Sequence, residues 1–66
     1  MDELQQKIIQ TMKSITLSDG IVSVNMEEVA QKLNTDIADS QFEKAIEELV
    51  HNTQIRYIDS INAEII

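Results

Sequence analysis

Residues 25–51 have the pattern of two helices joined by a short turn, and the rest of the chain must pack around them. Asn25 can cap the first helix, and Glu28 follows three residues later, where the acid of a capping box belongs. Asn34, Thr35 and Asp36 then bring turn-forming side chains. Apolar residues recur at helical spacing on one face of each segment, namely Val29, Ala30 and Leu33 in the first and Phe42, Ala45, Ile46 and Leu49 in the second. These signals predict a helix-turn-helix.

The start of the second helix of this motif can also be predicted. Asp39 or Ser40 should cap it, and Glu43 would complete a capping box with Ser40. Ile37 is an apolar residue in the turn, and we expect it to fill the gap between the two helices.

Residues 2–16 predict a further helix before the motif. One apolar face is formed by Leu4, Ile8, Met12 and Ile15 and widened by Ile9 and Leu17. Ser18, Asp19 and Gly20 should end this helix, with Gly20 at a positive φ. Phe42 is the largest apolar residue of the helix-turn-helix, so we expect it to lie in the core between all three helices.

Three short segments have the composition of strands. Residues 21–24 are rich in β-branched side chains but too few to be stable alone. Residues 54–59 predict a second strand, residues 60–62 a turn, and residues 63–66 an antiparallel return. A lone hairpin is marginal in water, so residues 21–24 should add a third strand. The sequence therefore predicts one α+β domain over residues 1–66, in the order α-β-α-α-β-β.

The charge balance limits the possible partners. The net charge is −7, and the cations Lys7, Lys13, Lys32, Lys44 and Arg56 are scattered singly. Neutralising DNA phosphates needs clustered lysine and arginine. An acidic surface can attract a basic partner, or can simply keep a small protein dissolved and monomeric. No apolar run is long enough for a membrane span, there is no signal-peptide pattern and there is no cysteine. These observations predict an intracellular protein, in the cytoplasm or the nucleus.

No motif for catalysis, a cofactor or a metal is present. Adjacent helical residues point about 100° apart, so the pairs Glu27–Glu28 and Glu47–Glu48 do not converge on one atom. His51 is the only histidine, and zinc needs several converging ligands. One glycine cannot make a phosphate-binding loop. We therefore expect a protein that is not an enzyme and has no catalytic, cofactor or metal site.

The element order with a central helix-turn-helix resembles the winged-helix family over nearly the whole chain. Residues 40–49, followed by a strand-turn-strand, resemble the C-terminal winged helix of replicative helicase (MCM) subunits. Gly20 before an apolar strand, and Ile55, Arg56, Tyr57 and Asp59 after the last helix, resemble the C-terminal winged helix of the replication protein A middle subunit. Winged helices that end PCI-type scaffold subunits are also similar. The resemblance implies a small winged helix in a DNA replication or repair assembly.

One segment departs from these families. They usually carry glycine or an acidic turn after the last helix, whereas residues 51–54 here read His-Asn-Thr-Gln. Asn52 can adopt the left-handed conformation, so the geometry of this helix end can be kept.

Several residues should form the binding surface. In DNA-reading winged helices the second helix of the motif presents basic and amide side chains to the major groove. Here the expected binding residues on that helix and on the wing are mostly acidic: Gln41, Glu43, Lys44, Glu47, Glu48, Arg56 and Asp59. We expect them to bind a basic, partly apolar protein segment, with direct DNA binding weak or absent. A small DNA-binding transcription regulator is the alternative, and a structural role in a larger complex is a third possibility.

Overall fold

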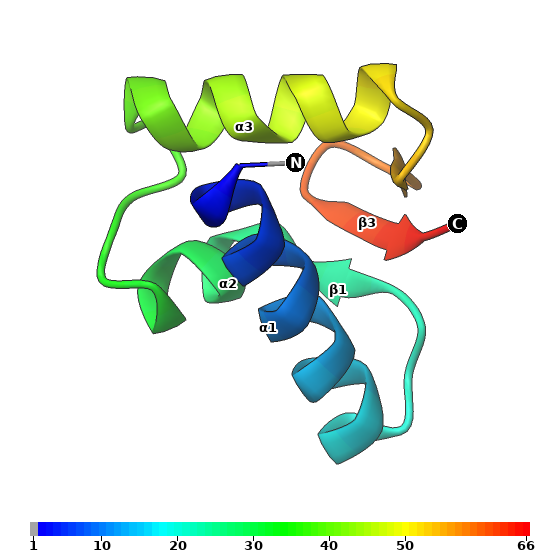
Figure 1. Ribbon diagram of the computed structural model, residues 1–66. Coiled ribbons are helices and arrows are strands. Elements are labelled where there is room, and N and C mark those ends of the chain that lie inside the picture. Colours follow the sequence, from blue (N-terminus) through cyan, green and yellow to red (C-terminus); the bar gives the residue numbers. More distant parts are fainter. Residues whose placement is uncertain (1) are drawn as a thin grey trace.

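The predicted order of helices and strands is confirmed by a computed structural model, which describes residues 2–66. Within that range the chain forms α1 (Glu3–Asp19), β1 (Val24–Asn25), α2 (Met26–Lys32), α3 (Ser40–His51), β2 (Ile55–Tyr57) and β3 (Asn62–Ile65). α1 lies against both α2 and α3, and the small sheet covers the remaining side of the core (Figure 1). The fold class is therefore α+β, as predicted. None of the helices in residues 2–66 is long and apolar enough to cross a membrane.

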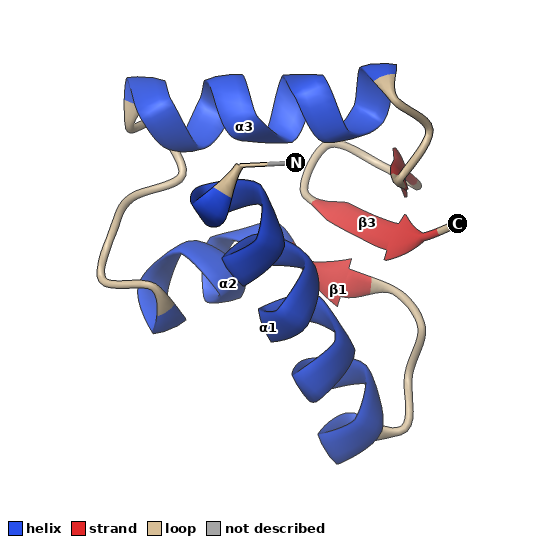
Figure 2. Ribbon diagram, in the orientation of Figure 1, coloured by secondary structure: helices blue, strands red, loops and turns tan. Residues whose placement is uncertain are grey.

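The sheet is antiparallel, with β3 between β1 and β2 (Figure 2). Val24 pairs with Ala63 at one side of β3, and Ile55 pairs with Ile65 at the other. This confirms both the C-terminal hairpin and a third strand contributed from before the helix-turn-helix. The extent of that third strand was predicted wrongly, because it begins at Val24 and leaves Ile21 and Val22 in an exposed loop. Of the predicted strand, only the Val24 side chain reaches the core, so burial stabilises only this last position.

α1 continues one turn beyond its predicted end, to Asp19. Gly20 then ends it at φ 72°, as expected, and its N–H donates to the Thr16 carbonyl at 2.9 Å. Leu17 does not widen the apolar face, since its side chain is 86% exposed. Leu17 follows the fully buried Ile8 by nine residues, which is two and a half helical turns at 3.6 residues per turn. It must therefore point away from the core.

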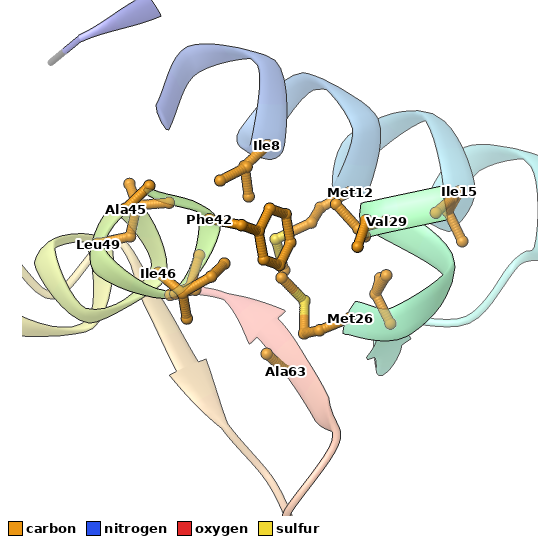
Figure 3. Close-up of a cluster of buried hydrophobic side chains, with 13 residues drawn as sticks. Ile8, Met12, Ile15, Met26, Val29, Phe42, Ala45, Ile46, Leu49 and Ala63 are labelled. Atoms are coloured by element: carbon orange, nitrogen blue, oxygen red, sulfur yellow. The ribbon is translucent and has the colours of Figure 1, made fainter. Parts of the chain in front are cut away.

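Phe42 occupies the centre of the core, as predicted. Its side chain is 1% exposed. It lies between Ile8 and Met12 of α1 and Met26 and Val29 of α2 (Figure 3). The predicted apolar stripe of α3 is buried throughout, so this helix presents one apolar face to the core and its other face to solvent. Burial of that stripe fixes which α3 residues are available to a partner.

The helix ends explain how α2 and α3 are joined. The Asp39 carboxylate caps α3 by accepting from the N–H groups of Gln41 at 2.9 Å and Phe42 at 3.1 Å. Asp39, not Ser40, is therefore the cap. Ile37 is half-buried and packs against the core, as expected for a residue that fills the gap between the helices.

The left-handed residue at the end of α3 is not Asn52. Asn52 keeps φ at −86°, and Thr53 takes the left-handed conformation at φ 57°. The reason is a pair of hydrogen bonds, from Gln54 N–H to the Leu49 carbonyl at 2.9 Å and from Thr53 N–H to the Val50 carbonyl at 3.0 Å. This bonding is that of a Schellman motif, which places the left-handed residue one position after Asn52.

Candidate functional site

The solvent-facing side of α3 carries the residues predicted for binding. Gln41, Glu43, Lys44, Glu47 and Glu48 are all exposed, because the buried stripe of the helix fixes its orientation. Three of these five side chains are carboxylates, and Lys44 is the only lysine or arginine in α3. This face therefore has an excess of negative charge.

The N-terminus of α1 extends this face. A surface hollow lies where α1 meets α3, and it is lined by Asp2, Gln5, Lys44, Glu47, Glu48, His51 and Asn52. Gln5 is only 6% exposed, and its side-chain amide donates a hydrogen bond to the Glu48 carboxylate. That bond ties the two helices together and orients Glu48. We call Asp2, Glu43, Glu47 and Glu48, with the intervening Gln41 and Lys44, the acidic surface.

Sequence reasoning missed the part played by Asp2 and Gln5. Asp2 is the N-cap of α1, and its carboxylate accepts from the Gln5 N–H at 2.8 Å. Gln5 precedes the buried Ile8 by three residues and therefore shares its face of α1. That spacing was the available signal that a polar side chain lies on the core-facing side of this helix.

Arg56 lies on the wing, which comprises β2, β3 and the turn between them. Arg56 and Glu64 are directly opposite each other in the ladder, and their side chains form an ion pair. Opposite charges at such positions attract across a sheet. Arg56 is therefore paired within the domain, although its side chain stays largely exposed to solvent.

Asp59 holds the turn of the wing. Its carboxylate accepts from the N–H groups of Ile61 at 2.9 Å and Asn62 at 2.8 Å, and from the Asn62 side-chain amide at 3.0 Å. These hydrogen bonds hold the pKa of Asp59 below its usual value, and the one from the Asn62 side chain has the largest effect. The contacts of Asp59 thus shape the turn, while its charge stays exposed to solvent.

The acidic surface reaches toward β2. Partial burial raises the pKa of the Tyr57 phenol, and the negative charge of Glu43 raises it further. Tyr57 is the only tyrosine of the chain, so its ionisation can be measured without interference from another phenol. Glu43 therefore lies near enough to β2 for its charge to act on Tyr57.

The arrangement is suited to attracting cationic groups. Among residues 2–66 no three histidine, aspartate or glutamate side chains come together in a way that could hold a metal ion. The carboxylates of the acidic surface are solvent-exposed. Exposed carboxylates of this kind attract cations at long range and contribute modestly to each contact.

Comparison with known proteins gave no match, whether with protein-family models, with curated proteins or with solved structures.

Proposed function

We propose that this chain is a winged-helix module that binds a basic, partly apolar segment of a protein partner. The observation that carries the proposal is the acidic surface, where four carboxylates from α1 and α3 are opposed on α3 by Lys44 alone. The partner's lysine or arginine side chains would lie against α3 and in the hollow beside Gln5. Its apolar side chains would contact the partly exposed Val50 and Tyr57.

Charge argues against DNA as the main ligand. In a winged helix α3 would be the helix that enters the major groove. Here Glu43, Glu47 and Glu48 would come close to phosphates, and the repulsion would oppose binding. Arg56 would have to exchange its ion pair with Glu64 for a phosphate contact. Ordinary affinity for duplex DNA needs several cationic contacts.

A helix laid along the domain is the favoured form of the partner, since an amphipathic helix can place its apolar face on one side and its cations on the other. A role in a DNA replication or repair assembly is supported only by the resemblance to winged helices of that kind. One observation favours the alternative of a DNA-binding transcription regulator: the Arg56 side chain is 69% exposed at the wing, where it could approach a phosphate.

Charge reversal on α3 tests the proposal. The probe is a fluorescein-labelled model helix with leucines on one face and lysines on the other. Glu47→Lys with Glu48→Lys should weaken its binding roughly tenfold, since each exposed charge pair contributes on the order of 0.2–1 kcal/mol and reversal replaces attraction with repulsion. Added salt should weaken binding to the native protein.

Glu27→Lys with Glu28→Lys is the matched control, because it changes the net charge equally on α2, away from α3. If the control weakens binding as much as the α3 variant, the acidic surface has no specific role. Equal binding by all three proteins would refute the proposal.

A further inference from the structure

An apolar patch lies at the end of the domain opposite the acidic surface. Leu17, Val22 and Ile65 line one hollow together with Lys13 and Thr16, and Ile21 adjoins Val22 in the chain. The exposed fractions are 86% for Leu17, 59% for Val22 and 53% for Ile21. α3 crosses the N-terminal end of α1, whereas this patch surrounds its C-terminal end (Figure 1). We call Leu17, Ile21, Val22 and Ile65 the apolar patch.

Neither hollow at the patch is lined by a carboxylate, and Asp19, between Leu17 and Ile21 in the chain, is the nearest acid along α1. α1 has no acid from residue 4 to residue 18, although the chain has net charge −7. A second hollow along α1 is lined by Gln10, Lys13, Ser14, Leu17 and Ser18. Lys13 is the only charged side chain among the described residues that line either hollow. Two copies that meet at these hollows therefore bring few like charges together.

The backbone beside the patch is also open to a partner. β1 is an edge strand, since within residues 2–66 it pairs only with β3. Residues 21–23 lead into it outside the ladder, although their side chains favour a strand. An unpaired edge is a template for another extended segment. Two identical segments related by a twofold axis can pair antiparallel, because each presents the same groups to the other.

We propose that the apolar patch joins two copies of this chain in a twofold dimer, with Leu17 and Val22 of each copy packed against the same residues of the other. A domain of this size buries little core and gains stability from association. Such a dimer points the two acidic surfaces away from each other, so both stay accessible. This inference does not rest on the proposed function, because the two surfaces lie at different ends of the domain.

Sedimentation equilibrium on the whole chain tests the dimer. With so small a patch we expect a dissociation constant of about 10–100 μM, typical of a weak interface. Added salt should tighten association, because it screens the repulsion between two copies of charge −7. Binding of a basic partner at the acidic surface would respond to salt in the opposite direction.

Leu17→Gln should raise the dissociation constant at least tenfold while leaving the melting temperature of the monomer unchanged, since the side chain is exposed. Ile58→Gln is the matched control, because Ile58 is also exposed but lies on the wing, and it should leave association unchanged. A protein that stays monomeric at about 1 mM in high salt would overturn the proposal, as would a dimer that survives Leu17→Gln. If the protein is monomeric under these conditions, a second copy of the chain does not cover this patch.

Discussion

Replacing Phe42 with alanine should remove a large part of the stability of this domain. Phe42 is 1% exposed and contacts side chains from two helices besides its own. Truncating a buried phenylalanine costs about 3–5 kcal/mol, from lost transfer free energy and from the cavity that remains. A 66-residue domain has a total stability of only about 3–10 kcal/mol at the usual 0.05–0.15 kcal/mol per residue. The variant should therefore be at the edge of folding.

Thermal denaturation followed by circular dichroism measures this loss. For a domain of this size each 1 kcal/mol lowers the melting temperature by roughly 4–8 °C, so a fall of roughly 12–40 °C is expected. Val50→Ala is the control, because it truncates a partly exposed side chain on the same helix and should change stability by about 0.5 kcal/mol or less. A loss under about 1 kcal/mol in Phe42→Ala would show that the ring does not fill the core.

Three further predictions concern the helix end, the wing and α3. Thr53→Gly should stabilise the protein by up to about 1 kcal/mol in a thermal melt, since a β-branched residue at positive φ is strained there. Glu43→Gln should lower the pKa of Tyr57, measured from tyrosinate absorbance, whereas Glu47→Gln should not. Identical Tyr57 titration curves for the native protein and both variants would contradict the placement of Glu43 near Tyr57. Because the pKa of Asp59 is lowered in the folded state, its contribution is present above its usual pKa of about 3.9 and is lost as pH falls from that value through the folded-state pKa. The protection of the wing-turn amides from exchange, relative to the unfolded chain at the same pH, should fall over this range, and unchanged protection would count against this role of Asp59.

Much of the fold could be predicted because it depends on local chemistry and periodicity. The spacing of the apolar residues of α3 requires a single buried face, and Gly20 is the residue best able to end α1 at positive φ. Leu17 could have been placed in the same way, from its spacing to Ile8, whereas Ile21 could not. The residue type of Ile21 favours burial, and only the position of the rest of the core shows that no core lies beneath it.

The candidate site was predicted in part for the same reason. The exposed face of α3 follows from its buried face, so Glu43 and Glu47 could be identified from periodicity. The contribution of α1 could not, because the contact between Gln5 and Glu48 joins residues 43 positions apart. Nor does the sequence indicate that Arg56 is paired, since that depends on the register of β2 and β3.

Whether the acidic surface favours protein over DNA is tested by the affinity of the unmodified protein for duplex DNA at about 0.15 M salt, near physiological ionic strength. An acidic surface should give binding no tighter than the non-specific range of about 10⁻⁴–10⁻⁶ M. Fluorescence anisotropy with a labelled duplex measures this affinity, and the labelled basic helix serves as the comparison under the same conditions. We expect the basic helix to bind and the duplex to bind no more tightly than this non-specific range. A dissociation constant for DNA tighter than about 10⁻⁷ M would contradict it and favour the transcription regulator.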